Sequence, residues 1–315
     1  MWLLGVDGGG SHTACWVADE SGRVRGRGEA GPCNLGSVGP EAAEANLGAA
    51  ARAAMAQAGV RPADVAASCF GLAGFDRPGD RAALQAMALR LGLTGSLRIE
   101  NDAVIAWAGG CRARPGAVVL AGTGSIAYGR TGDGRSARAG GWGPLFGDEG
   151  SGFTLGRRAV TAALQAADGR GPATALAALL CRGLDIPTIE DAVSAIRWHD
   201  ADPARVAALA PLVLRAAAGG DAVALDILTQ AADGLAEMAV AVLARLGLHP
   251  AAALVVAGGS LLGEDTPLRR RLDAALRRRG VAGGARAPLL APVAGALLLA
   301  WATLGGNPDT WTPGG

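Results

Sequence analysis

The chain has 315 residues, half of them hydrophobic and 18% charged, a size that favours two domains with sizeable cores. Its 29 basic and 28 acidic residues leave a net charge of +1, so neither nucleic acid nor an anionic membrane is an expected partner. Every one of the 29 basic residues is an arginine. This excludes a lysine nucleophile, a Schiff base and a Walker-type lysine.

Cysteine and histidine usage points to a cytoplasmic protein without a zinc site. No two of the five cysteines are closer than 18 positions and no CxxC occurs, while the three histidines are scattered. The N-terminal apolar run reaches Asp7 too early for a signal peptide. Residues 287–308 are long and uncharged enough to imitate a membrane span, but their prolines and glycines predict a buried core helix. The Ala-rich helices would allow a homodimer.

Apolar periodicity predicts two successive α/β units. Strands are expected over residues 2–7, 13–19, 23–29, 65–72 and 97–100, and helices over residues 40–57, 77–91 and from 102. Strands then follow over 117–121, 126–130 and 136–139, helices from 152 to about 246, a strand over 253–257, and helices over 268–279 and 292–304. Both units open with a strand, a Gly-rich turn and two more strands. This order favours a duplicated α/β domain with a cleft between the copies.

The first Gly-rich turn, VDGGGSHT at residues 6–13, has the composition of a phosphate-binding hairpin. Glycine lets the backbone approach a phosphate and the hydroxyls add donors. The candidate phosphate-binding residues are Gly8, Gly9, Gly10, Ser11 and Thr13. Asp7, at the end of the strand, could hold Mg²⁺ through water. An ordinary Gly-rich hairpin is the alternative, since a chain this rich in glycine contains such a triplet about once by chance.

The second turn, LAGTGSIAYG at residues 120–129, repeats the pattern. Its candidate phosphate-binding residues are Gly122, Thr123, Gly124 and Ser125. Two such hairpins about one domain apart would clamp a phosphate from both sides, which is more specific than either alone. The GK[ST] of a Walker loop is absent, and neither hairpin opens a helix as a dinucleotide loop should.

Asp102, in IENDAVIAW, follows a strand at the start of a helix. It could be the helix N-cap. It could also be a general base that takes a proton from a hydroxyl nucleophile, and the paired hairpins favour this second interpretation.

Three further segments could bind ligands. In residues 140–160, Trp142 and Phe146 are either core anchors or part of a ligand loop, and Asp148-Glu149 between glycines suits polyol hydroxyls. A strand running into Gly258-Gly259-Ser260 and a helix would let the backbone approach adenine, or is a plain turn. Asn34 lies in a loop that could face the cleft or be only a turn, and Cys33 beside it is expected to be a small apolar residue.

Taken together, these loops resemble the sugar-kinase, actin and chaperone-ATPase superfamily. More narrowly they resemble the family that joins N-acetylglucosamine kinases with the BadF/BcrA-type ATPases, from about residue 3 to 302. GGWGPLFGDEGSGF together with GTGS and END is the most specific part. The stretch from 165 to 250 carries no diagnostic motif.

The resemblance implies two ribonuclease-H-like (actin-like ATPase) domains with ATP in an interdomain cleft. Residues 1–112, completed by helix 292–305, would form the first domain and residues 113–291 the second. Ser11 and Thr123 would contact phosphate, Asp102 would be the base and Asp7 would position Mg²⁺. The implied sugar-binding residues are Asn34, Asp102, Gly141, Trp142, Gly143 and Asp148, and Gly258, Gly259 and Ser260 would lie near the nucleoside.

The expected function is therefore ATP-dependent phosphorylation of the 6-hydroxyl of an amino sugar, foremost N-acetylglucosamine. Glucosamine is the close rival as substrate, and an ATPase that activates a partner enzyme is the rival from another class. The activator branch would need cysteines at a dimer interface, and neither Cys111 nor Cys181 lies in such a motif. His12, in the first hairpin, is expected to point to solvent.

Overall fold

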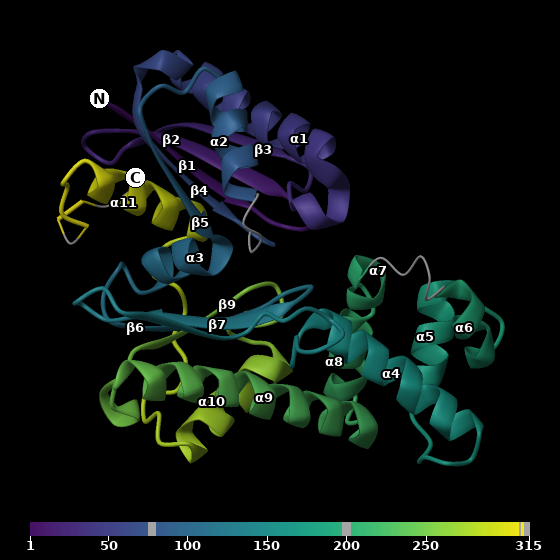
Figure 1. Ribbon diagram of the computed structural model, residues 1–315. Helices are drawn as coiled ribbons and strands as arrows, with labels where there is room; N and C mark the ends of the chain where they lie inside the picture. The colour runs from purple at the N-terminus through teal and green to yellow at the C-terminus, as the bar shows by residue number, and fades with distance from the viewer. Residues whose placement is uncertain (75–79, 197–202, 309, 312–315) are drawn as a thin grey trace. The chain divides into compact units, whose positions relative to one another are not determined.

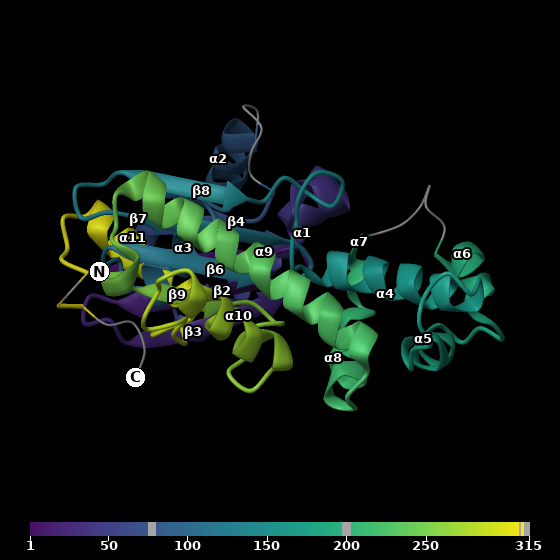
Figure 2. The same ribbon diagram turned by 90° about the horizontal axis from the view of Figure 1, so that it is seen from below.

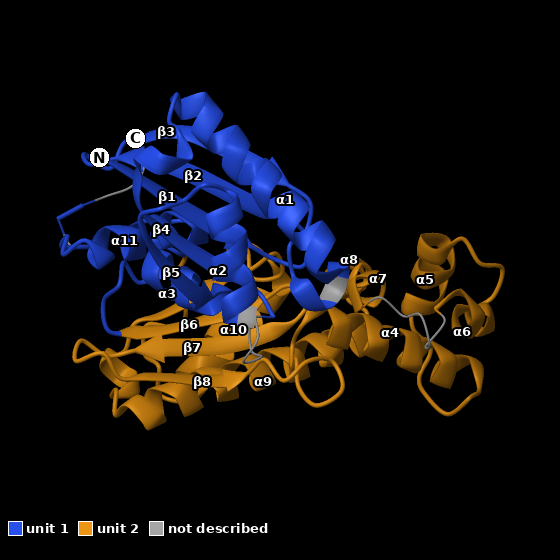
Figure 3. Ribbon diagram, turned by 45° about the horizontal axis from the view of Figure 1, so that its top comes forward, with its two compact units in different colours: residues 1–115, 288–315 blue, residues 116–287 orange. Residues whose placement is uncertain are grey.

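The computed structural model describes residues 1–74, 80–196, 203–308 and 310–311. The chain divides into two compact units, which Figure 3 colours separately: residues 1–115 with 288–315 form unit 1, and residues 116–287 form unit 2. The expected boundaries were 112 and 291. His199, the start of the helix expected over 77–91 and part of the C-terminal tail lie outside the described residues.

Unit 1 is built on a five-stranded sheet in the order β3-β2-β1-β4-β5. The strands are β1 (Trp2–Gly8), β2 (Thr13–Asp19), β3 (Val24–Ala30), β4 (Val65–Leu72) and β5 (Ser96–Asn101). The first three are antiparallel neighbours, whereas β4 is parallel to β1 and β5 is parallel to β4. All five predicted strands are confirmed to within one residue at either end.

Helices cover both faces of this sheet (Figure 1). Their bounds are α1 (Leu35–Ala58), the single turn η1 (Pro62–Asp64), α2 (Asp80–Arg90), α3 (Asp102–Gly110) and α11 (Pro292–Thr303). One face packs its buried side chains against α1 and α2, and α11 packs with α3 against β1 and β4. The start expected for α1 at Pro40 is instead a kink at Gly39, where φ is +78°. The helix begins earlier because Asn34 caps it.

Helix α11 lies against β1 and α3 at backbone distance. A Cβ on Gly295 would lie 2.0 Å from the Ile105 carbonyl oxygen, and a Cβ on Gly109 would lie 2.7 Å from the Ala291 carbonyl oxygen. A Cβ on Gly5 of β1 would lie 2.7 Å from the Val293 carbonyl oxygen. The predicted buried helix near the C-terminus is thus confirmed, and glycine permits its approach.

Unit 2 contains a four-stranded sheet in the order β8-β7-β6-β9. The strands are β6 (Gly116–Ala121), β7 (Ser125–Arg130), β8 (Ser136–Gly140) and β9 (Val255–Gly258). As in unit 1, the first three are antiparallel neighbours and the fourth is parallel to the first. A fifth strand is reduced to one parallel bridge between Val256 and Arg286.

Along the chain, the helices of unit 2 follow β8 and precede β9, except for one helix that follows β9. They are α4 (Gly152–Ala167), α5 (Leu176–Leu184), α6 (Ala192–Ala195), α7 (Pro203–Ala207), α8 (Ala210–Ala218), α9 (Ala222–Leu246) and α10 (Pro267–Arg278), with single turns η2 (Ile189–Asp191) and η3 (Pro250–Ala252). Figure 2 shows α9 lying along the sheet. Helix α9 is long and apolar enough to cross a membrane. Its apolar side is buried in the core of unit 2, as expected of a core helix.

The shared strand order confirms the duplicated α/β fold. In both sheets the chain runs through three antiparallel strands, leaves through helices and returns parallel to the first strand. No close sequence repeat accompanies this likeness, since only the pattern of buried positions and turns has to be kept.

The contact between α3 and α11 yields a stability prediction. Replacing Gly295 with Ala places a methyl group against backbone that cannot move aside, so we expect the free energy of unfolding to fall by about 3 kcal/mol. Gly48→Ala in α1 is the matched helical control, because its Cβ meets only the Arg52 side-chain tip and Leu91. Denaturant unfolding should show the control unchanged or more stable by up to about 1 kcal/mol. Equal stabilities for the two variants would contradict the packing described.

Candidate active site

In unit 1 the predicted residues lie at the edge where three strands end. The parallel register pairs Gly8 of β1 with Leu72 of β4, and Leu72 with Asn101 of β5. Parallel strands present their carboxyl ends at one edge, which is where open α/β sheets bind ligands. Asp7, the hairpin that follows it and Asp102 are therefore brought to the same edge.

Asp7 is a carboxyl held in an environment that disfavours its charge. It lies on the central strand β1, paired with Ala14 on β2 and Gly71 on β4. Burial raises its pKa to about 6. A Cβ on Gly71 would lie 2.3 Å from Ile105, so α3 covers the face toward which Asp7 points. A divalent cation would stabilise such a carboxylate.

The described residues contain no group of three or more His, Cys, Asp or Glu side chains that could hold a metal ion. Magnesium in nucleotide sites keeps several waters and is bound by one or two carboxylates together with phosphate oxygens. Asp7 alone therefore fits the protein's share of such a site.

Asp102 is the first residue of α3 and not its cap. The cap is Asn101, whose side-chain oxygen accepts a hydrogen bond from the Ala103 N–H at 3.0 Å. Asp102 Oδ1 accepts from the same N–H at 2.8 Å, and the side chain is half-buried. The alternative that Asp102 is the N-cap is therefore wrong.

Asn34, like Asn101, is the N-cap of a helix. Its Oδ1 accepts from the Gly36 N–H at 2.9 Å and caps α1. The amide lies against Gly74, where a Cβ would come within 2.7 Å of it. The sequence analysis did not identify Gly74, although a glycine soon after a strand end is a signal for close backbone approach. Since the oxygen serves the helix, the amide nitrogen is the group that Asn34 can offer to a ligand.

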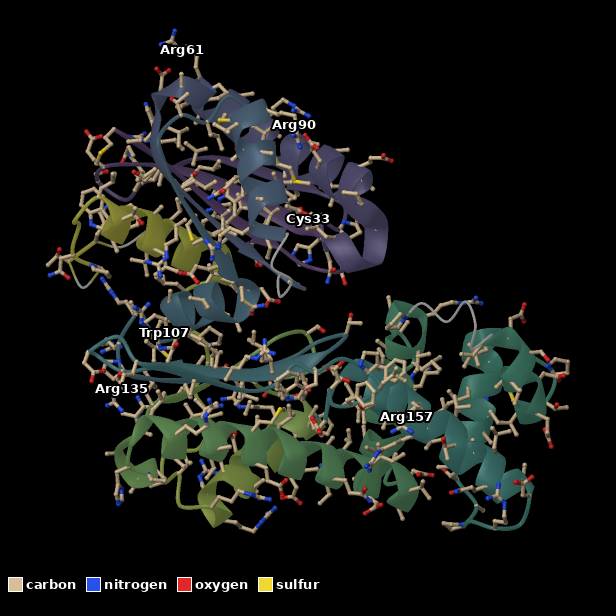
Figure 4. The ribbon with its side chains drawn as sticks, in the orientation of Figure 1. Cys33, Arg61, Arg90, Trp107, Arg135 and Arg157 are labelled. Carbon is tan, nitrogen blue, oxygen red and sulfur yellow. The ribbon has the colours of Figure 1, made fainter. Side chains whose placement is uncertain are left out.

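The glycines of the first hairpin serve different purposes. A Cβ on Gly8 would lie 2.2 Å from the sulfur of Cys33 (labelled in Figure 4), so packing alone demands glycine there. Cys33 is 3% exposed and, as expected, is a small apolar residue. A Cβ on Gly10 would have nothing within 4 Å. Ser11 is exposed at the turn, and so is His12, as expected.

Thr13 does not point into the hairpin's open side. The residue is fully buried, and its hydroxyl donates to the Gly31 carbonyl at 2.8 Å. The predicted phosphate contact of this hydroxyl is therefore wrong, because the donor is spent inside the protein.

Unit 2 gathers the remaining predicted residues in the same way. Strands β6 and β9 are parallel, with Leu120 opposite Gly258, so the turns that follow them lie at one edge. A Cβ on Gly122 would lie 3.9 Å from Ser260 Oγ. The Leu261 N–H donates to the Ala121 carbonyl at 3.2 Å, which joins the two turns.

The second hairpin closes through a hydrogen bond of 2.9 Å from the Gly122 N–H to the Gly124 carbonyl, with Thr123 exposed between them. Ser125 is 4% exposed, and its hydroxyl donates to the Glu149 carbonyl at 2.8 Å. Its predicted phosphate contact is wrong for the same reason as that of Thr13.

Asp148 is buried and has a left-handed backbone. Only 7% of it is exposed, its φ is +60°, and its Oδ1 accepts from the Ser125 N–H at 3.1 Å. Burial raises its pKa, while that hydrogen bond acts in the opposite direction. The Thr154 hydroxyl donates to the Asp148 carbonyl at 2.7 Å. The sequence analysis missed Thr154 and the α4 cap Ser151, although serine at a helix start is a capping signal.

The loop before Asp148 exposes its large apolar side chains. Trp142, Leu145 and Phe146 are 64%, 81% and 83% exposed. The interpretation of Trp142 and Phe146 as core anchors is therefore wrong. The Arg138 guanidinium lies 4.7 Å from the Trp142 ring centroid and orients it. Gly141 and Gly143 have φ of +70° and +81°, which fits glycine.

The turn after β9 requires glycine at one position. Gly259 has a φ of +93°, and a Cβ there would lie 2.3 Å from the Ala121 carbonyl oxygen. The helix expected after this turn, over residues 268–279, is confirmed, since α10 spans Pro267–Arg278. The nucleoside contact of Gly258, Gly259 and Ser260 stays a prediction.

Comparison with known proteins places this arrangement in a family. The model of the BadF/BadG/BcrA/BcrD ATPase family matches residues 4–300. The chain belongs to this family. It is 36% identical over 259 residues to the N-acetylmuramic acid/N-acetylglucosamine kinase of Clostridium acetobutylicum, covering 82% of this chain and 85% of the relative. It is 33% identical over 276 residues to the N-acetyl-D-glucosamine kinase of Dictyostelium discoideum, with the same coverage.

A solved structure from Chromobacterium violaceum, proposed to be an N-acetylglucosamine kinase, is also similar. It is 29% identical and superimposes with a TM-score of 0.74, covering 95% of this chain and 98% of the other. A ROK family glucokinase from Streptomyces griseus has a TM-score of 0.58 at 19% identity, covering 95% and 99% of the two chains. The fold of this family member is therefore the two-domain ribonuclease-H-like fold of actin-like ATPases.

The raised pKa of Asp7 predicts a pH-dependent stability. Folding raises this pKa from about 3.8 to about 6, so the folded chain binds the proton more tightly and stability falls as pH rises through that interval. Asp7→Asn cannot ionise. In EDTA we expect the stability of Asp7→Asn, relative to that of wild type, to be about 2 kcal/mol higher at pH 8 than at pH 4.

Denaturant unfolding at both pH values measures this difference. Asp133→Asn is the control that should change little between these pH values, because Thr131 and Arg135 lower the pKa of Asp133 to about 2 and its stability effect is therefore lost only below about pH 4. A relative stability of Asp7→Asn that does not change with pH would contradict the burial described.

The open space at Gly10 separates ligand contact from folding. Gly10→Ala meets no protein atom within 4 Å, so the unfolding free energy should change by less than about 0.5 kcal/mol. If phosphate approaches this backbone, the KM for ATP should rise by about tenfold, a loss of about 1.4 kcal/mol. Gly283→Ala, also with open space around its Cβ, is the matched control. An unchanged KM for ATP would exclude Gly10 from the phosphate site.

Proposed function

We propose that this family member is an ATP-dependent amino-sugar kinase that phosphorylates the 6-hydroxyl of N-acetylglucosamine. The observation that carries the proposal is Asp102. Because Asn101 takes the capping role, α3 begins with a carboxylate that its fold does not need as a cap, at the edge where β1, β4 and β5 end. Two relatives more than 30% identical to the chain are named as kinases acting on N-acetylglucosamine.

Each hairpin tip offers donors that suit a nucleotide phosphate. Backbone at Gly9, Gly10, Gly122 and Gly124 and the exposed hydroxyls of Ser11 and Thr123 offer phosphate donors. Asp7 would hold Mg²⁺, which neutralises charge on the phosphates when bound. Gly258, Gly259 and Ser260 would lie near the nucleoside, since their turn is joined to the second hairpin through Ala121.

Each unit offers groups that suit a sugar. In unit 1 these are the Asn34 amide and the Asp102 carboxylate, and in unit 2 they are the loop from Gly141 to Gly143 and Asp148. An exposed indole and a buried carboxylate in the same loop suit a sugar, because the ring can pack on an apolar sugar face and the carboxylate can accept from its hydroxyls.

Asp102 would act as the general base. It takes the proton from the 6-hydroxyl as that oxygen attacks the γ-phosphorus, and the bond to the bridging oxygen of ADP breaks in line. The product is the sugar 6-phosphate. Hairpin amides and hydroxyls stabilise the charge that develops on the transferred phosphoryl group.

The cysteines bear on where the protein is located and on the rival role as an activator of a partner enzyme. None of the five cysteines, all within the described residues, forms a disulfide, which suits the cytoplasm. Cys111 is fully buried in unit 1, so it offers no exposed ligand for an iron–sulfur cluster shared between subunits. The amino sugar is the partner proposed, and the homodimer stays a prediction.

The deciding experiment is ADP release from Mg-ATP with N-acetylglucosamine, glucosamine, N-acetylmannosamine, N-acetylmuramic acid, glucose or no sugar. Strong stimulation by N-acetylglucosamine supports the proposal. Greater stimulation by glucosamine would select the rival substrate, as named for a 28% identical relative from Vibrio cholerae. Hydrolysis that ignores every sugar would overturn the kinase and favour an ATPase acting on a partner.

Asp102→Asn tests the base within the same assay. The amide keeps the shape and can accept the Ala103 N–H, but it cannot take a proton, so kcat should fall roughly 10²–10⁴-fold at unchanged stability. A variant that keeps more than about a tenth of wild-type kcat is incompatible with this role.

A further inference from the structure

Two buried hydroxyls occupy equivalent positions in the two units. Thr13 is the first residue of β2 and Ser125 the first residue of β7. Each follows a Gly-rich hairpin turn and opens the antiparallel partner of the central strand. Thr13 is 0% exposed and Ser125 is 4% exposed, so neither hydroxyl can reach a phosphate at the hairpin tip.

Each hydroxyl instead joins its hairpin to the loop proposed to bind the sugar. The Thr13 hydroxyl donates to Gly31, three residues before Asn34, at 2.8 Å. The Cys33 N–H returns a second bond, to the Gly9 carbonyl at 3.2 Å. In unit 2 the Ser125 hydroxyl donates to the Glu149 carbonyl at 2.8 Å. The Ser125 N–H donates to the Asp148 carboxylate at 3.1 Å.

These bonds hold a backbone that would otherwise relax. Asp148 has a φ of +60°, a left-handed conformation that costs free energy for any residue except glycine. It is kept there by Ser125 on one side and by the Thr154 hydroxyl, which donates to the Asp148 carbonyl, on the other. If the second hairpin moves when phosphate binds, the orientation of the Asp148 carboxylate therefore changes as well.

We propose that Thr13 and Ser125 are positioning residues that couple nucleotide binding at each hairpin to sugar binding at the loop beside it. The inference rests on the proposed kinase function. Occupation of a hairpin tip favours the loop geometry that binds sugar, and by linkage the sugar tightens the nucleotide by the same factor. Both units carry this arrangement at the same place in a shared strand order.

The test compares Thr13→Val and Ser125→Ala, which remove only the hydroxyls, with wild type. Calorimetry measures the Kd of AMPPNP with Mg²⁺ in the absence and presence of saturating N-acetylglucosamine. For wild type we expect the sugar to tighten AMPPNP by about fivefold or more. In each variant this factor should fall to within about twofold of unity, while the Kd of each ligand alone changes by less than about threefold. Thr13→Ser keeps the hydroxyl and should keep the coupling.

Matched controls are Thr303→Val in unit 1 and Thr229→Val in unit 2. Their hydroxyls donate to Leu299 and Leu225 one helical turn earlier, away from both loops. Both controls should preserve the coupling factor. Because the two hydroxyls lie in different units, either variant tests the proposal if the other fails to fold.

A merely structural role would have a different signature. It would lower the melting temperature and weaken both ligands while the coupling factor stayed at its wild-type value, and that result would overturn the proposal. Wild type that phosphorylates the sugar but shows no coupling would also overturn it. Failure of the kinase itself is distinguished by the absence of any sugar-dependent ADP release.

Discussion

The candidate site residues of each unit are brought together by parallel strand pairing, of β1 with β4 and β4 with β5 in unit 1, and of β6 with β9 in unit 2. Parallel strands end at the same edge of a sheet, so every turn that follows such a strand is brought to that edge without any contact between the turns being specified in advance. Asp7 and Asp102 are separated by most of unit 1 in sequence, yet both follow from this one constraint. The Gly122 and Ser260 turns meet in unit 2 for the same reason.

Glycine makes the remaining contacts possible, but for several physical reasons. Gly295, Gly109 and Gly5 let backbones touch where α11 completes unit 1, and Gly8 leaves room for Cys33. Gly259 supplies a backbone conformation that other residues rarely adopt. Gly10 meets no neighbour at all. Packing within the chain therefore does not explain glycine at that position.

The hydroxyl groups of the two hairpins also fall into two sets, one exposed and one buried. Ser11 and Thr123 are exposed at the hairpin tips, whereas Thr13 and Ser125 are buried and joined to neighbouring loops. A buried donor has to be satisfied within the protein. The two kinds of hydroxyl look alike in a motif, and burial separates those that are accessible to a ligand from those that bond to neighbouring loops.

Strand alternation, turn glycines and strand order are local patterns, so the sequence predicts the duplicated α/β order and elements such as 13–19 and 65–72 correctly. The sequence also predicts that Asp7 lies near a strand end, that Asp102 starts a helix and that Asp148 lies in the loop before the next helix. Which side chains near these positions face outward follows from the folded structure, since burial depends on neighbours distant in the chain. The structure shows that Asn101 and not Asp102 caps α3, and that Trp142 and Phe146 are exposed. It also shows that the hydroxyls of Thr13 and Ser125 donate to backbone carbonyls inside the protein. Local spacing carries no information about those partners, which the chain brings together only when it folds.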